Sequence, residues 1–158
     1  MRTISVSGHS VMIDDQDYLH VNQFTWHITK RKHTYYVFRY VKISTSKYTI
    51  LLLHRDLMGC TKGDGKLIDH KDRNGLNCQR SNLRFCTRSQ NRANSVSSGG
   101  SKFKGVSWKK SKGLWRTALQ FNGKHIHVGY FDNEIDAAKA YNAEAVKYHK
   151  EFTCLNQV

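Results

Sequence analysis

The sequence is poor in acidic residues. Its 12 Asp and Glu stand against 26 Lys and Arg, which gives a formal net charge of +14 over 158 residues. Such a surplus resists compaction unless a polyanion neutralises it, and nucleic acid is the commonest partner of that kind. Residues 1–100 carry 16 basic and 7 acidic side chains, and residues 101–158 carry 10 and 5. Both halves are therefore expected near phosphate, unless the protein is merely soluble and basic.

Cysteine pairs and long apolar runs are also missing. Cys60, Cys78, Cys86 and Cys154 form no CxxC pair, which argues against a zinc ribbon. No secretion signal is recognisable, so we expect reduced thiols in a soluble, intracellular protein. The longest apolar run, at 50–53, is far too short to span a bilayer, and no membrane partner is expected. The hydrophobic fraction of 39% is adequate for folded cores.

Residues 1–60 predict strands around one early helix. Strands are indicated at 10–13, 35–41 and 48–54, the last two rich in β-branched and aromatic residues. A short helix over 17–24 follows Asp14 and Asp15, which suit a helix start. Trp26 is expected to anchor this small core, and stacking on a base is the alternative.

The stretch 95–101 is rich in Ser and Gly, which predicts a flexible linker between residues 1–94 and 102–158. Strands are indicated beyond it at 105–109, 114–121 and 124–128, with Asn122-Gly123 as a two-residue hairpin turn. A helix is expected over 133–150, because Ala138, Tyr141, Ala145 and Tyr148 recur at helical spacing.

Side chains that could bind a metal or accept a proton are concentrated in residues 66–94. A strand from Leu67 is expected to present Asp69 and His70 at its end, a second strand spans 83–85, and Thr87 and Gln90 have capping-box spacing for a helix from Arg88. Phosphodiester hydrolysis requires a hard cation and a base for the attacking water. Carboxylate and amide oxygens suit Mg²⁺, and an imidazole accepts a proton near neutral pH. Ordinary turn residues are the plainer interpretation of the Asp, His and Asn positions.

This segment resembles the HNH endonucleases of the ββα-metal type, in particular the homing branch with an Asp-His start followed by asparagines. The resemblance implies one Mg²⁺ or Mn²⁺ per active site, held by Asp69 and Asn91, with His70 as general base and Asn82 positioning it. Many HNH enzymes carry His where Asn91 stands, but the homing branch shares the asparagine. The segment 53–58 also resembles the one that precedes the motif, and His54 within it is expected to be structural or phosphate-facing rather than catalytic. Arg84, Arg88 and Arg92 flank the motif and are expected to hold the DNA backbone.

Residues 103–156 resemble the DNA-binding domain of plant ethylene-response factors, which also occurs fused to HNH nucleases. The matching residues include Phe103–Val106, Trp115, Gly129–Phe131 and Ala137-Ala138. In that family a three-stranded sheet lies in the major groove, with a helix packed behind it. The resemblance assigns the contact face, which Arg116 joins through its strand parity: Lys104, Ser107, Lys109, Arg116, Gln120, His125 and His127. A metal site at His125 and His127 is the alternative, although no third ligand is evident.

We therefore expect an α+β protein. A ββα-metal HNH nuclease domain with a preceding β-rich region would occupy 1–94, and a three-stranded antiparallel sheet packed on one helix would occupy 102–158. The expected function is metal-dependent hydrolysis of double-stranded DNA by a nicking or homing enzyme, a monomer or homodimer on DNA, encoded by a phage or mobile element and acting in the host cytoplasm. A non-catalytic DNA-binding regulator with a relic nuclease fold and a structured-RNA binder are the competing hypotheses.

Overall fold

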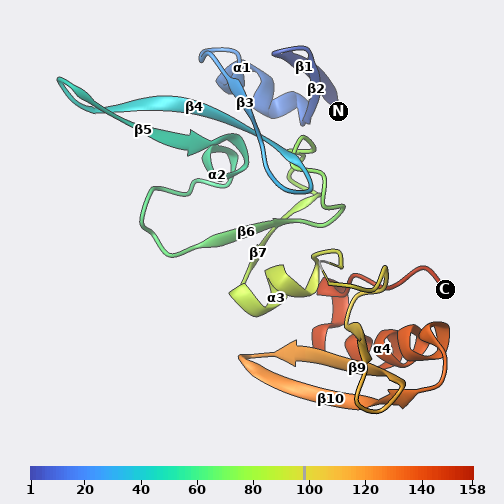
Figure 1. Cartoon of the computed structure of the whole chain (residues 1–158). Coiled ribbons are helices and arrows are strands. Elements are labelled where there is room, and N and C mark those ends of the chain that lie inside the picture. The colour runs from blue at the N-terminus through green and yellow to red at the C-terminus, as the bar shows by residue number, and fades with distance from the viewer. Residues whose placement is uncertain (98) are drawn as a thin grey trace. The chain divides into compact units, whose positions relative to one another are not determined.

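The computed structural model describes residues 1–97 and 99–158. These residues form an α+β fold with four small antiparallel sheets, several short helices and one longer helix, and they divide into two compact units, Met1–Cys86 and Thr87–Val158 (Figure 1). No helix among the described residues is long and apolar enough to cross a membrane. The two units are described separately below.

The first unit begins with a hairpin and a short helical segment. Its first elements are β1 (Arg2–Val6), β2 (His9–Ile13), the 3-10 turn Asp15–Asp17 and α1 (Tyr18–Val21). Ser7 and Gly8 both adopt positive φ in the β1–β2 turn, as a tight hairpin requires. The predicted helix over 17–24 is thus confirmed in place but is shorter than expected, since only one turn is α-helical.

A three-stranded sheet and a short helix follow. The sheet order is β3–β4–β5, and the elements are β3 (His27–Lys30), β4 (Tyr35–Ser44), β5 (Lys47–Leu52) and α2 (Leu53–Leu57). The predicted strand over 48–54 is wrong at its end, because Leu53 and His54 form the first turn of α2. The reason is packing: Leu53 and Leu57 are spaced four residues apart, so one helical face buries both in the core with Val37.

One hydrophobic cluster holds the first unit together. Val11, Ile13, Val21, Val37 and Leu53 are at most 1% exposed, and Trp26 packs against them. The indole N–H of Trp26 donates to the Val21 carbonyl at 2.8 Å. The core role expected for Trp26 is thus confirmed, and base stacking is not available to a ring only 8% exposed.

The last two strands of this unit form a separate hairpin with a long loop. β6 (Leu67–His70) pairs antiparallel with β7 (Leu83–Cys86), as predicted. The loop between them is fastened to β2, since Met12 exchanges backbone hydrogen bonds with Leu76 and Cys78. Arg80 also donates Nε and Nη2 to the Asp17 carboxylate. These ties connect the hairpin loop to the core of the unit.

The second unit contains a short helix, a three-stranded sheet and a long helix. The elements are α3 (Arg88–Ala93), β8 (Val106–Lys109), β9 (Leu114–Phe121), β10 (Lys124–Phe131), α4 (Glu134–His149) and the 3-10 turn Lys150–Phe152. The sheet order is β10–β9–β8, and Asn122 and Gly123 form the β9–β10 turn with positive φ, which confirms the predicted hairpin. The predicted capping box is confirmed as well: Thr87 and Gln90 exchange side-chain and backbone hydrogen bonds at the start of α3.

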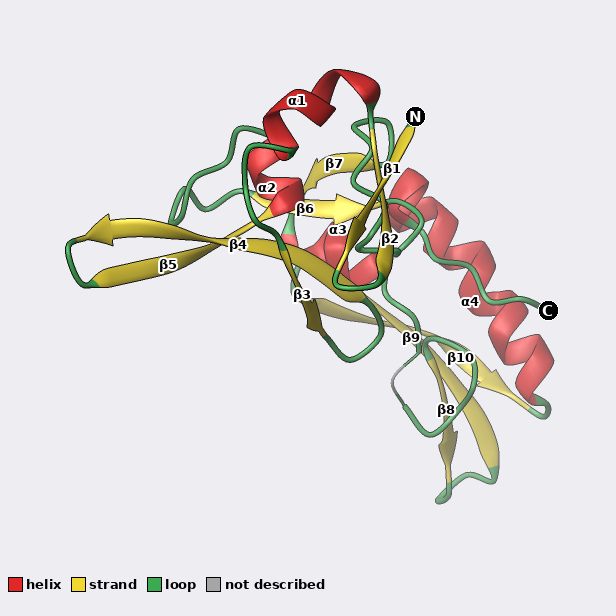
Figure 2. Ribbon diagram, turned by 90° about the horizontal axis from the view of Figure 1, so that it is seen from above, coloured by secondary structure: helices red, strands yellow, loops and turns green. Residues whose placement is uncertain are grey.

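Helix α4 packs along one face of this sheet (Figure 2). Ala137, Ala138, Tyr141 and Ala145 are buried, and the small alanines allow close approach to β9. Tyr148, expected on the same face, is 36% exposed, and His149 is buried there instead. The predicted helical face is therefore confirmed except at its last turn.

The end of α3 is joined to the rest of the second unit by polar contacts. The Lys104 ammonium donates to the carbonyls of Arg92, Ala93 and Ser95, and Cys154 N donates to the Ala93 carbonyl. Ser101, at the end of the predicted linker 95–101, is buried and donates to Glu134. Residue 98 of that linker lies outside the described residues, and the predicted boundaries at 94 and 102 stay predictions.

Gly105→Ala should destabilise the second unit more than Gly113→Ala. Both glycines have positive φ, which costs a non-glycine residue about 1–2 kcal/mol. A Cβ at Gly105 would also lie 2.1 Å from a Tyr141 ring carbon, whereas none of the described residues lies within 4 Å of one at Gly113. Overpacking adds about 1–3 kcal/mol. Urea unfolding monitored by tryptophan fluorescence measures the difference, and equal losses in both variants would contradict this packing.

Candidate functional site

Asp69 and Arg84 form a cross-strand ion pair on the β6–β7 hairpin. They are directly opposite in the antiparallel register, and Arg84 donates Nε and Nη2 to Asp69 Oδ2 at 2.9 and 2.8 Å. Both side chains are largely withdrawn from solvent, with 7% of Asp69 and 14% of Arg84 exposed. The guanidinium therefore neutralises a buried carboxylate at the position expected to hold metal.

His70 follows Asp69 and lies in a cluster of rings. Its imidazole centroid is 4.8 Å from that of His54 on α2 and 5.8 Å from the ring of Tyr36 on β4. Tyr36 and His54 are themselves 5.6 Å apart, so the three rings contact one another. Three different elements thus fix the orientation of the predicted general base.

Burial sets the protonation state of these histidines. Burial, together with the smaller effects of the nearby His70 and Arg55, lowers the pKa of His54 to about 3. Burial also lowers the pKa of His70, an effect that Asp72 and Asp69 partly oppose. Both imidazoles are consequently neutral at pH 7. A neutral imidazole at His70 is the form that accepts a proton.

Asn82 fixes the loop that carries the hairpin. Its amide nitrogen donates to Asp72 Oδ1 and to the Asn77 carbonyl, each at 2.9 Å, and its amide oxygen accepts from the backbone N–H of Asp72. Asn82 is buried, so these bonds form away from solvent. The bonds described here hold the loop, and the expected role of Asn82 in positioning His70 stays a prediction.

The remaining predicted site residues of the stretch 66–94 lie on α3. Asn91, Arg88 and Arg92 are exposed on that helix. Arg84, predicted to hold the DNA backbone, is instead engaged with Asp69 and half-buried. The metal role of Asn91 and the DNA contacts of the arginines remain predictions.

The donor chemistry fits a hard divalent cation. Asp69 supplies carboxylate oxygens and Asn91 an amide oxygen, both of which Mg²⁺ and Mn²⁺ accept while keeping water and phosphate oxygens in other positions. Among the described residues, no group of three or more His, Cys, Asp and Glu side chains gathers in one place. The assignment of Asp69 and Asn91 as metal ligands therefore stays a prediction.

The open face of the β8–β10 sheet carries most of the predicted DNA contacts. Thr117 and Leu119 of β9 point to α4, so Arg116, Ala118 and Gln120 point to the other face. Cross-strand register places Ser107 beside Arg116, and His127 and His125 beside Ala118 and Gln120. Lys109 extends the same face on β8.

Two of these residues have different surroundings from those expected. Lys104 directs its ammonium to the carbonyls at the end of α3, and Gln120 is half-buried with an amide oxygen that has no hydrogen-bond partner among the described residues. Gln120, His125 and Arg92 line a pocket of about 240 Å³ within this unit. Outside this pocket, the predicted face consists of Ser107, Lys109 and His127, which are exposed, and Arg116, which is half-buried.

Part of the first unit and helix α3 match a known protein family. Residues 59–93 match the family model described as HNH endonuclease. This HNH segment contains β6, β7 and α3, together with Asp69, His70, Asn82 and Asn91. The match supports an HNH nuclease domain with DNA as substrate. No solved structure matches the chain.

Sequence reasoning did not single out Tyr36 and Asp72. Tyr36 comes from β4, and it contacts the histidines only because the fold brings that strand to β6. Asp72 stands two residues after His70 and bonds both Asn82 and Asn77. The Asp-x-Asn-Gly pattern at 72–75 could have indicated a structural role for Asp72, because Asp side chains commonly accept hydrogen bonds from nearby backbone N–H groups in turns.

His54→Phe should make the protein less sensitive to acid. The folded pKa of His54, about 3, lies below its unfolded value of about 6.5, so the unfolded state binds more protons once the pH falls below 6.5. The contribution of His54 to the free energy of unfolding is fully present above pH 6.5 and declines towards pH 3. At pH 5 it has fallen by about 2 kcal/mol. The decrease in urea-unfolding free energy between pH 7.5 and 5 should shrink in His54→Phe and remain unchanged in His33→Phe, which alters an exposed histidine. Equal decreases in both would contradict a buried, neutral His54.

Proposed function

We propose that the protein is a metal-dependent DNA endonuclease of the HNH type that hydrolyses phosphodiester bonds. The observation that carries the proposal is the buried Asp69–His70 pair at the end of β6, inside the segment that matches HNH endonucleases. Asp69 and Asn91 are the proposed ligands of one Mg²⁺ or Mn²⁺. When bound, that ion would neutralise charge on the phosphate and on the leaving oxygen.

His70 is the proposed general base. It would accept a proton from the attacking water, and its lowered pKa keeps its imidazole neutral and able to do so at pH 7. The ring contacts with His54 and Tyr36 restrict its rotation before substrate arrives. Restriction of this kind lowers the entropic cost of aligning base, water and phosphate.

Duplex DNA is the proposed substrate, and the second unit is proposed to bind it. A three-stranded sheet fits the major groove, and Ser107, Lys109, Arg116 and His127 lie on the face opposite α4. An ethylene-response-factor-like domain at 102–158, joined through a linker at 95–101 to a nuclease domain at 1–94, remains our interpretation of that arrangement. The homing character and the phage or mobile-element origin are likewise proposals from the resemblance.

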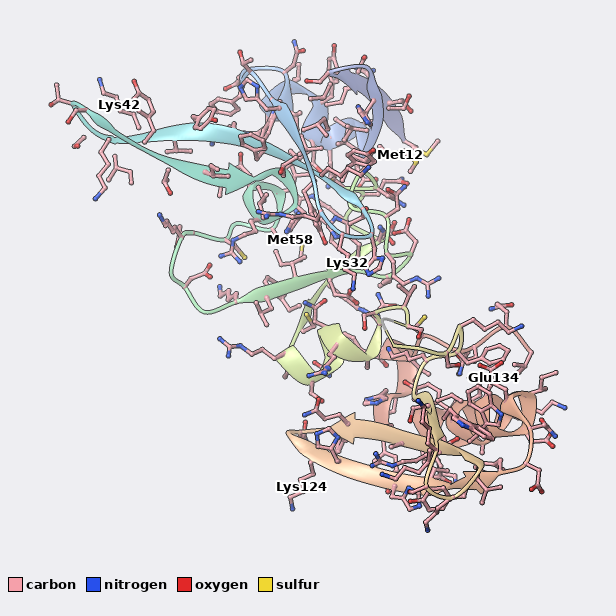
Figure 3. The ribbon with its side chains drawn as sticks, viewed as in Figure 1. Met12, Lys32, Lys42, Met58, Lys124 and Glu134 are labelled. Carbon is pink, nitrogen blue, oxygen red and sulfur yellow. The ribbon has the colours of Figure 1, made fainter. Side chains whose placement is uncertain are left out.

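The β4–β5 ribbon of the first unit supports contact with a polyanion. The sequence has no acidic residue from Tyr18 to Arg55, yet it has seven Lys and Arg there. On one face of the ribbon Tyr40 lies opposite Ile50, and Lys42 lies opposite Tyr48, and all four are exposed. Figure 3 shows Lys42 close to the outer end of the ribbon. Apolar side chains with lysines on a two-stranded ribbon are typical of surfaces that enter a DNA groove.

One active site per chain favours nicking. A monomer would cut one strand per event, and a double-strand cut would require a homodimer on DNA or two successive events.

Purified protein should nick supercoiled plasmid with Mg²⁺ or Mn²⁺, and Asp69→Asn and His70→Ala should each reduce the rate by about 100-fold or more while DNA binding is retained. Gel separation of nicked from supercoiled plasmid measures the rate, and a gel shift measures binding. Asn91→Ala should lower the rate through weaker metal binding. Circular dichroism establishes that each variant is folded.

Wild-type protein that binds DNA without cutting it, over several metals and substrates, would favour the DNA-binding regulator instead. Preferential competition by structured RNA over duplex DNA would favour the RNA binder.

Lys42→Gln combined with Lys47→Gln should weaken DNA binding and reduce its salt dependence. Each lysine that neutralises a phosphate adds about 0.9 to the slope of log affinity against log salt, so its removal should lower the slope by that amount. The matched control is Lys139→Gln combined with Lys147→Gln on α4, which removes the same formal charge away from the sheet faces. Fluorescence anisotropy from about 50 to 200 mM salt measures both slopes. An equal change in the two double variants would show that only net charge matters.

A further inference from the structure

The Asp69–Arg84 pair occupies the carboxylate that the proposed metal needs. Asp69 Oδ2 accepts two hydrogen bonds from one guanidinium, and the pair is almost completely withdrawn from solvent. A carboxylate oxygen has two lone-pair positions, so these bonds engage the direction along which a cation would bind Oδ2. Arg84 and a divalent ion that binds Oδ2 therefore compete for the same atom.

Two other arginines of the first unit, Arg55 and Arg80, form ion pairs that hold loops in place. Arg55 bonds Asp64 but also the carbonyls of Thr61 and Lys66, so it braces a loop. Arg80 grips Asp17 with the same two nitrogens, Nε and Nη2, but 43% of its side chain is exposed, and it ties the β6–β7 loop to the core. Arg84 instead pairs with Asp69, the residue directly opposite on the neighbouring strand. The strand pairing already holds these two residues together, so the ion pair does not brace a loop.

We propose that Arg84 stands in for the metal at Asp69, yields to it when it binds, and then donates to substrate phosphate. This inference rests on the proposed function, because it takes Asp69 to be a metal ligand. In the metal-free protein the guanidinium offsets the charge of the buried carboxylate and keeps it in place on β6.

The exchange is chemically reasonable for arginine. A guanidinium displaced from Asp69 would lie close to a phosphate bound at the metal, and its planar donors match phosphate oxygens in the paired geometry that they show here with a carboxylate. Because metal and phosphate both draw on Arg84, each would strengthen the binding of the other. Arg84 would thus contact DNA, as the sequence predicted, but only after the metal takes its place.

The test is Mn²⁺ binding to the full chain without DNA, measured by electron paramagnetic resonance of the free ion. Arg84→Gln removes the competing cation and should tighten Mn²⁺ binding by about tenfold, within the usual range of coupling between sites. Arg39→Gln is the matched control, since it breaks another largely buried Arg–Asp pair of the same unit, with Asp56, and makes the same change in charge. Its Mn²⁺ affinity should stay within about twofold of wild type.

Thermal unfolding gives a second measurement on the same three proteins. Arg84→Gln should melt below wild type in EDTA, because Asp69 loses the two hydrogen bonds from the guanidinium, and should gain more than wild type when Mn²⁺ is added. Arg39→Gln should also melt lower in EDTA but gain only as much as wild type. If Arg84→Gln does not fold, Arg84→Lys keeps the charge with one point donor and should tighten Mn²⁺ binding by a smaller factor.

Unchanged or weaker Mn²⁺ binding in the Arg84 variants would overturn the inference, as would absence of Mn²⁺ binding in every variant and wild type. The nicking assay separates this failure from failure of the proposed function. A wild type that nicks plasmid while Arg84→Gln binds Mn²⁺ no more tightly leaves the nuclease proposal intact. Tighter binding in Arg84→Gln by a protein that never nicks supports the metal exchange and ends the nuclease proposal.

Discussion

The antiparallel register of β6 with β7 is the constraint on which the proposed chemistry depends. It places Asp69 opposite Arg84 and His70 opposite Leu83, so a charged pair and a buried imidazole stand side by side on four-residue strands. A slip of one residue would turn each side chain to the other face of the hairpin. Two such short strands would not fix their own register, because an isolated hairpin is marginally stable in water.

The register is fixed from outside the strands. The loop that joins them is held by Asn82 and Asp72 within itself, and by Arg80 and Met12 to the first elements of the chain. Residues far apart in the sequence thereby decide where Asp69 and His70 point. The N-terminal hairpin, which contributes no proposed catalytic group, is in this sense part of the support of the site.

Local patterns in the sequence predicted much of the fold. The capping box at Thr87, the Asn122-Gly123 turn and the alanine face of α4 each depend on residues a few positions apart, and all three are confirmed. The predicted end of β5 is wrong because Leu53 and His54 fit a strand by composition, and only burial of Leu53 with distant Val37 selects a helix. The same limit applies to the site: spacing pointed to Asp69 and His70, but no local signal links Tyr36 to His70 or commits Arg84 to Asp69.

The bonding of Lys104 has a consequence for how the modules of this chain can be exchanged. Composition suggests dividing the protein in its Ser- and Gly-rich stretch, yet the carbonyls of Arg92 and Ala93 that Lys104 and Cys154 bond belong to α3, which precedes that stretch. A graft that begins at residue 102 would carry an ammonium and an amide with no helix end to receive them, whereas one that begins at Thr87 keeps donor and acceptor together. A transplanted C-terminal module should therefore include α3, the last helix of the HNH segment.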